Sequence, residues 1–113
     1  SYKIEQIQIS QTIQDISNSL PKDSWLESIS VLKKTKLTNN TKIRKIVLIG
    51  YSGNGKAAET YVNSIKQCKQ INECNLEKIQ ILKDKSKELG KIDSFKFKII
   101  CELNPITSNK KLI

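Results

Sequence analysis

The sequence predicts an α+β domain in which two helices cover one face of a largely antiparallel four-stranded sheet. Two segments carry apolar residues at helical spacing, the last strand segment alternates strictly, and a polar turn separates two neighbouring strand segments. The chain has 113 residues, which fits one domain. We place that domain at residues 1–104 and a flexible tail at 105–113. The expected element order is helix, strand, strand, helix, strand, strand.

The first helix is expected over residues 5–19. Apolar residues fall at positions 4, 7, 9, 13, 16 and 20, which is close to the spacing of one helix face, and Pro21 ends the pattern. Residues 2–9 have an alternative as a strand, because Ile7 and Ile9 are two positions apart.

A hairpin is expected next. Residues 23–34 form a strand that places Trp25, Ile29 and Val31 on one face, although Glu27 interrupts that face. Residues 36–42 are polar turn material around two asparagines, and residues 43–51 form an apolar strand. The two strands are therefore expected to pair.

The second half repeats a helix and two strands. An apolar stripe predicts a helix over residues 56–71, and Ile79 and Ile81 share one face of a strand over residues 76–83. Over residues 95–103 every second residue from Phe95 onwards is apolar, and Lys96, Lys98 and Glu102 lie between them, which is the clearest strand pattern in the chain.

The composition excludes several classes of function. The net charge is +9, which is compatible with an acidic partner such as nucleic acid, but Arg44 is the single arginine and base readers favour the guanidinium fork. There is no run of about 18–20 apolar residues that could span a membrane. The chain starts at Ser1 and contains no methionine, so we expect a domain of a longer protein.

Three cysteines and no histidine do not supply a typical set of four zinc ligands, and no metal or cofactor is expected. Cys68 and Cys74 are close enough in sequence to form a disulfide in an oxidising compartment, and Cys101 is typical of core packing. The absence of histidine also excludes His-based acid–base catalysis and catalytic triads. Asp84 and Asp93 are expected to be solvated surface charges, and no catalytic residue is predicted.

Residues 50–56 match the phosphate-binding pattern G-x-x-x-x-G-K between a strand and a helix. Ala57 stands where a magnesium-binding Ser or Thr is required, so a degenerate nucleotide-binding loop is the weaker alternative. The ordinary interpretation is that the glycines relieve strain in a strand-to-helix turn, with Ser52 as a turn residue.

Residues 95–98 interleave phenylalanine and lysine, as some single-stranded RNA platforms do. Alternation places Phe95 and Phe97 on one face and both lysines on the other, so the rings are expected to be core. An RNA-binding module remains the alternative function. It requires the element order βαββαβ, with residues 2–9 as a strand.

The order and spacing of several hydrophobic motifs resemble the PilN family of type IV pilus assembly proteins over residues 17–103. The matching features are Leu20-Pro21 leading into Trp25-Leu26, a strand at Ile46 to Gly50, a helix with Tyr61, Val62 and Ile65, and the strand from Phe95 to Leu103. The loop from Gly50 to Lys56 is richer in glycine than the family pattern, and PilO-type and type II secretion relatives share the architecture.

The resemblance implies a ferredoxin-like two-layer sandwich in αββαββ order, on the outer side of the cytoplasmic membrane. It implies an upstream cytoplasmic tail that binds a PilM-like protein, one membrane helix and a coiled coil. It further implies scaffolding rather than catalysis, through dimerisation or pairing with a PilO-like partner, with no nucleic acid bound.

Overall fold

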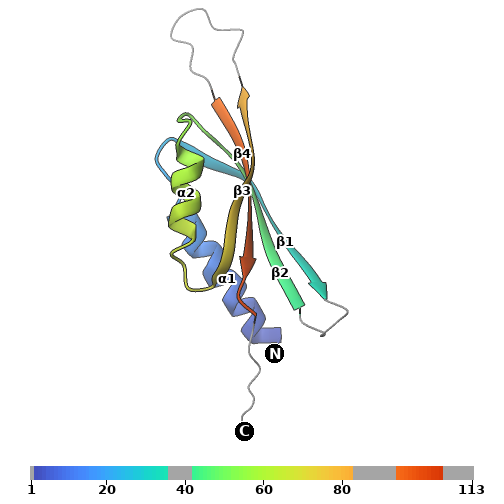
Figure 1. Cartoon of the computed structure of the whole chain (residues 1–113). Helices are drawn as coiled ribbons and strands as arrows, with labels where there is room; N and C mark the ends of the chain where they lie inside the picture. Colours follow the sequence, from blue (N-terminus) through green and yellow to red (C-terminus); the bar gives the residue numbers. More distant parts are fainter. Residues whose placement is uncertain (1, 36–41, 83–93, 106–113) are drawn as a thin grey trace, which may run out of the picture.

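The computed structural model describes residues 2–35, 42–82 and 94–105. Its elements in chain order are α1 (Tyr2–Asn18), β1 (Ser24–Thr35), β2 (Lys42–Ser52), α2 (Ala57–Ile65), β3 (Ile71–Leu82) and β4 (Ser94–Leu103). The strands form one antiparallel sheet in the order β1-β2-β4-β3, and both helices lie on the same side of it (Figure 1). This confirms the predicted α+β class and αββαββ order, which are consistent with a ferredoxin-like sandwich.

The core lies between the two helices and the facing side of the sheet. Alternate residues of β4 are buried, and those of β2 follow the same period. The predicted strand over 95–103 and its inward face are therefore confirmed. The buried apolar residues are Ile16, Ile46, Leu48, Ala57, Ala58, Tyr61, Val62, Ile65, Ile71, Cys74, Phe97, Ile99, Cys101 and Leu103.

Helix α1 confirms the predicted helix and extends it to Tyr2, so the alternative strand over residues 2–9 is wrong. Ile16 is fully buried, and Ile9 and Ile13 pack against the core. The buried Thr12 hydroxyl donates to the carbonyl of Gln8 at 2.7 Å, which satisfies it within the helix. The apolar face of α1 therefore fixes this helix on the sheet.

Helix α2 ends at Ile65, six positions before the predicted end at Ile71. The amides of Gln67 and Cys68 donate to carbonyls three residues earlier, so the chain tightens into turns. Strand β3 begins at Ile71, five positions before the predicted start, because it pairs with β4 from Leu103 onwards. Register shifts in β3 hide its alternation from sequence analysis.

The hairpin of β1 and β2 is confirmed, but the predicted face of β1 is wrong. A register shift between Leu26 and Ser28 makes Glu27 an extra residue, which is a β-bulge. An extra residue reverses the alternation, so Trp25 lies on the face opposite Ile29 and Val31. The residue that interrupted the sequence pattern is thus the one that turns Trp25 away from the helices.

Some sequence predictions lie outside the described residues. They concern the turn at residues 36–41, the connection at 83–93 with Asp84 and Asp93, and the tail from residue 106 onwards. The domain limits at residue 104 stay a prediction.

Tyr61 joins the two helices. Its ring packs edge-on against Phe97, with centroids 6.1 Å apart, and its hydroxyl donates to the carbonyl of Ile16 at 2.8 Å. Burial, with smaller contributions from the neighbouring cysteines, raises the pKa of Tyr61 above its usual range. The neutral phenol is therefore the form that the folded domain accommodates.

Replacing Tyr61 with phenylalanine is expected to lower the free energy of unfolding by about 1 kcal/mol at neutral pH, because the Ile16 carbonyl loses its buried donor. Below pH about 10 the tyrosine is neutral in both states, and above it only the unfolded state ionises readily. The wild type should therefore lose stability as the pH rises through that value, by more than Tyr61→Phe does. Urea denaturation at a series of pH values measures both effects. Tyr51→Phe is the control for loss of a phenol hydroxyl, and equal alkaline slopes for wild type and Tyr61→Phe would contradict the prediction.

Candidate functional site

The sheet face that points away from the helices, here called the open face, carries the most prominent surface feature. In the described part of the chain no helix covers it (Figure 1). Along each strand, every second residue points to this face, and the register between strands shows which residues these are. Its members include Trp25, Leu32, Ile43, Val47, Ile49, Tyr51, Lys96, Lys98, Ile100 and Glu102.

Trp25 and Tyr51 form the aromatic end of the open face. They are directly paired across β1 and β2, and their rings stack with centroids 5.7 Å apart and an interplanar angle of 20°. The Lys96 ammonium lies 5.6 Å from the Tyr51 centroid and 3.8 Å from the Glu27 carboxylate. Trp25 is nevertheless 52% exposed, so a large apolar surface is held in a fixed position and stays available for contact.

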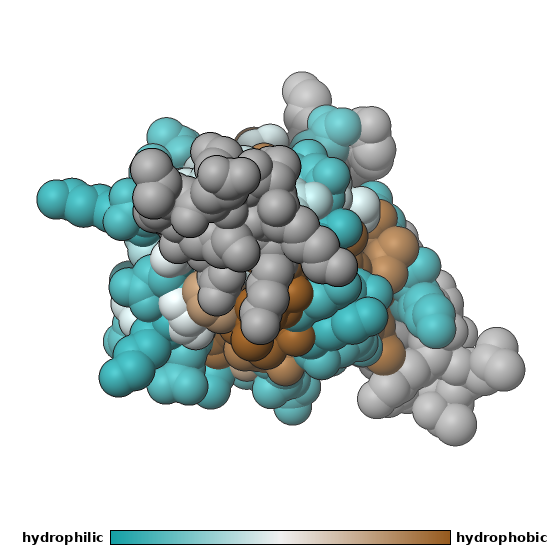
Figure 2. Space-filling view, turned by 90° about the horizontal axis from the view of Figure 1, so that it is seen from above, coloured by the Kyte–Doolittle hydropathy of each residue, from teal (hydrophilic) through white to brown (hydrophobic). Residues whose placement is uncertain are grey.

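The charges of the open face are mixed in sign. Lys98 pairs with Glu77 at 3.1 Å, and Lys45 lies opposite Glu102 in the register. Seen from above, the molecule presents hydrophobic side chains in separate patches between hydrophilic ones (Figure 2). Because lysine and glutamate are interspersed on the open face, the excess of positive charge is not concentrated there.

Several polar groups of the loop from Gly50 to Lys56 already form hydrogen bonds within the protein. The Gly53 amide donates to the carbonyl of Asp23 at 2.9 Å, and the Lys56 amide donates to the side-chain oxygen of Asn54 at 2.8 Å. The Ser52 hydroxyl is buried and donates to the Asn54 carbonyl at 2.8 Å. Ser52 is the last residue of strand β2, not the turn residue that the sequence predicted. The amides of Gly53 and Lys56 are therefore already engaged, and the preceding strand belongs to an antiparallel sheet, unlike the parallel strand of a phosphate-binding loop.

The glycines of this loop do not have the role predicted from sequence. None of Gly50, Gly53 and Gly55 has a φ angle in the left-handed region, whereas Asp23 has φ of 62°. Gly50 is required for a different reason. A Cβ there would lie 2.6 Å from the Trp25 carbonyl oxygen and 2.7 Å from the Phe97 ring.

The interleaved segment at residues 95–98 has the predicted arrangement. Phe97 is buried against Tyr61, and Lys96 and Lys98 lie on the open face. This confirms that Phe97 is core and not a base-stacking platform. The aromatic residues that do lie on the open face, Trp25 and Tyr51, come from β1 and β2 and were not predicted there. The signal that could have placed Trp25 on the open face was Glu27, whose charge interrupts the apolar alternation at the position of the bulge.

The cysteines give the second feature. Cys74 and Cys101 are buried and directly paired across β3 and β4, and their sulfur atoms lie 3.3 Å apart. Cys101 confirms its predicted place in the core. The hydrogen bond between the two thiols lowers the pKa of Cys74 and raises that of Cys101 above its usual range. Cys68 is half-buried after α2, where burial, and next the Asp15 carboxylate, raise its pKa.

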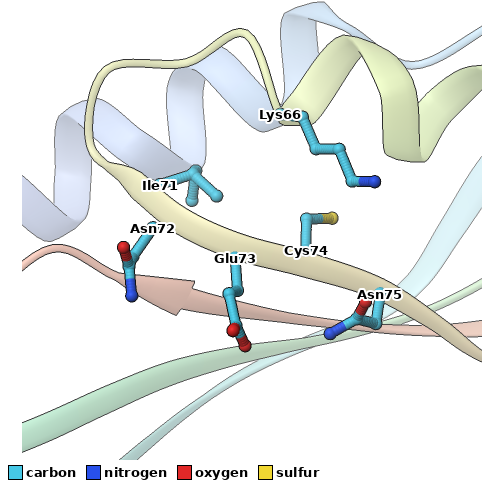
Figure 3. A pocket seen from close by; sticks show the side chains of 6 residues that line it. All are labelled: Lys66, Ile71, Asn72, Glu73, Cys74 and Asn75. Carbon is cyan, nitrogen blue, oxygen red and sulfur yellow. The ribbon is translucent and has the colours of Figure 1, made fainter.

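A pocket of about 340 Å³ adjoins Cys74. Its lining residues come from the end of α2 and the start of β3 (Figure 3). In that view Lys66 and Cys74 lie on the helix side of β3, whereas Glu73 points to the opposite side. The positive charge of Lys66 is a further, smaller cause of the lowered pKa of Cys74.

The described residues lack a metal-binding cluster and a membrane-spanning helix. Among them, no group of three or more His, Cys, Asp or Glu side chains could hold a metal ion. No described helix is both long and apolar enough to cross a membrane.

The fold and the open face define a class of protein: a small α+β sandwich with two helices on one side and an uncovered sheet face on the other. The family model for the fimbrial assembly protein PilN matches residues 11–103, so the chain belongs to the PilN family. This confirms the resemblance found in the sequence. The family has a structural role in the assembly of type IV pili. Comparison with curated proteins and with solved structures gave no match.

Proposed function

We propose that this chain is the extracytoplasmic, partner-binding domain of a type IV pilus assembly protein and that it acts as a scaffold without catalysis. The proposed partner is a PilO-like protein or a second copy of the domain. The proposal includes a single upstream membrane helix in the cytoplasmic membrane and a cytoplasmic tail that binds a PilM-like protein. PilN family membership supports the role, and the exposed Trp25 on the open face is the observation that supports pairing.

The energetics of interfaces support the choice of Trp25. Tryptophan is enriched among the residues that dominate binding energy, and it contributes most when a partner removes it from water. Stacking on Tyr51 fixes the ring in advance, so little side-chain entropy is lost on binding. Mixed lysine and glutamate around it provide a polar rim that can pair with opposite charges on a partner.

Replacing Trp25 with alanine is expected to weaken pairing with the PilO-like partner by about 30-fold, the effect of losing roughly 2 kcal/mol at a central contact. Analytical ultracentrifugation over a concentration series measures the dissociation constant. Ile81→Ala is the matched control, because Ile81 is 58% exposed and lies on the helix side of β3. The control should bind within about twofold of the wild type.

Two outcomes would contradict this proposal. If the wild-type domain stays monomeric alone and with its partner at high concentration, pairing is wrong. If Ile81→Ala weakens pairing and Trp25→Ala does not, the open face is not the interface. Thermal unfolding of both variants shows whether each remains folded.

The same tryptophan distinguishes the RNA-binding alternative, because Trp25 is the single tryptophan and its fluorescence reports on the open face. Single-stranded RNA at low salt is expected to leave the emission unchanged. Salt-dependent quenching would favour RNA binding over scaffolding. The observed element order αββαββ already differs from the order that an RNA-recognition domain requires.

A further inference from the structure

Two buried cysteines, Cys74 and Cys101, are positioned so that they could form a disulfide. Cys74 and Cys101 are 27 positions apart in the chain, yet they face each other directly in the register of β3 and β4. Both side chains point into the core, and their sulfur atoms are 3.3 Å apart. The fold therefore brings together two thiols that the sequence keeps far apart.

We propose that Cys74 and Cys101 form a cross-strand disulfide when the folded domain meets a small-molecule disulfide oxidant. Residues that face each other in an antiparallel pair have Cα atoms about 4.5–5.5 Å apart. That interval lies within the Cα separation found in disulfides, about 4.4–6.8 Å. The sulfur atoms can therefore approach bonding distance by rotation of the two side chains, with the strand register unchanged.

This pairing replaces the one that sequence proximity favours. Cys68 is only six positions from Cys74 but lies in the turns between α2 and β3, half-buried. The short sulfur contact of Cys74 is with Cys101, across the strand pair. Cys68 is expected to remain a thiol when the bridge forms.

The pocket in Figure 3 gives an oxidant a route to Cys74. Cys74 and Lys66 both line it, and a lysine beside a thiol favours the reactive thiolate. The Cys74 thiolate attacks one sulfur of oxidised glutathione, which forms a mixed disulfide and releases one glutathione thiolate. The Cys101 thiol then loses its proton and attacks the Cys74 sulfur, which releases the second glutathione. Two protein thiols are oxidised, one glutathione disulfide is reduced to two thiols, and the chain loses two hydrogen atoms.

The disulfide would link the edge strand β3 covalently to its neighbour β4. β3 is an outer strand and β4 is a central one, so a covalent link between them resists loss of β3. Closing this long loop constrains the unfolded chain, and the melting temperature should rise by roughly 10 °C on oxidation. The bridge requires only the two thiols of this chain and an oxidant, whatever the pilus partner or the side of the membrane.

Tryptic mapping tests the pairing directly, because the three cysteines fall on separate peptides. Cleavage after lysine places Cys68 in residues 67–69, Cys74 in residues 70–78 and Cys101 in residues 99–110. The folded domain is treated with oxidised glutathione, its remaining thiols are alkylated, and the digest is analysed by mass spectrometry without reduction. The expected product joins peptides 70–78 and 99–110 and leaves Cys68 alkylated.

Variants separate this bridge from its competitor. Cys68→Ser is the matched control and should keep both the linked peptides and the rise in melting temperature. Cys101→Ala should lose both, and the wild-type map decides the question even if this variant is too unstable to study. A link between peptides 67–69 and 70–78 in the wild type would overturn the proposal. Three alkylated cysteines, or glutathione retained on Cys74 after oxidation of the folded domain, would also overturn it.

Discussion

Replacing Gly50 with alanine is expected to lower the free energy of unfolding by about 2–3 kcal/mol, as overpacking of a filled core does. Gly50 is buried in the central strand β2, between Leu26 of β1 and Phe97 of β4. The added Cβ would lie 2.6 Å from the Trp25 carbonyl oxygen and 2.7 Å from Cζ of Phe97. The carbonyl belongs to the bulged strand and the ring is packed under α2, so neither neighbour can move freely.

Gly53→Ala is the matched control for this prediction. Gly53 lies three residues further along the same glycine-rich segment, and a Cβ there would meet no atom within 4 Å. Its φ angle is outside the left-handed region, so alanine should change stability by less than about 0.5 kcal/mol. Urea denaturation of the two variants measures the difference. Equal stabilities would show that the space around Gly50 adapts and that close packing is not the reason for the glycine.

Replacing Arg44 with methionine is expected to cost about 3 kcal/mol of unfolding free energy, which is typical of removing one member of a buried charged network. Arg44 is 2% exposed although it carries a full charge. Its guanidinium donates to the side-chain oxygen of Gln8 in α1 and to the backbone carbonyl of Asn104 after β4. One side chain of β2 thus ties together the first helix and the end of the last strand.

Asn104 extends this network to the start of β3. Its backbone amide donates to the Gln70 carbonyl at 2.8 Å, and its side chain donates to the Lys69 carbonyl at 2.6 Å. In Figure 1 the beginning of α1 and the end of β4 lie at the same end of the molecule. Loss of Arg44 should therefore loosen this end first, which hydrogen exchange of the Asn104 amide can detect.

The controls for Arg44 test charge and geometry separately. Arg44→Lys keeps the charge but lacks the planar fork, so it should recover only part of the lost stability. Lys45→Met removes a cation from the next position of β2, on the open face, and should change stability by less than about 0.5 kcal/mol. If Arg44→Met and Lys45→Met were equally mild, the network around Arg44 would not contribute to stability.

The type and order of the helices and strands were largely predictable from the sequence. The order αββαββ, the hairpin and the inward face of β4 follow from hydrophobic periodicity, because that signal depends on neighbours along the chain. The resemblance to PilN used the same patterns, and the family match over residues 11–103 confirms it. The ends of α2 and β3 were wrong, since strand pairing with β4 extended β3 backwards into the expected helix.

The candidate site is formed by contacts between strands that are distant in the sequence, and hydrophobic periodicity along the chain does not predict such contacts. The sequence alone determined which segments are helices and strands, how they are ordered, and that Phe97 and Cys101 face the core. Only the tertiary structure decided that Trp25 lies on the open face, that Arg44 is buried, and that Cys74 meets Cys101. Each of these results requires two or more strands to be placed in register, and a bulge of one residue reverses which side chains meet. Register is set by packing across the sheet, between residues that are distant in the chain.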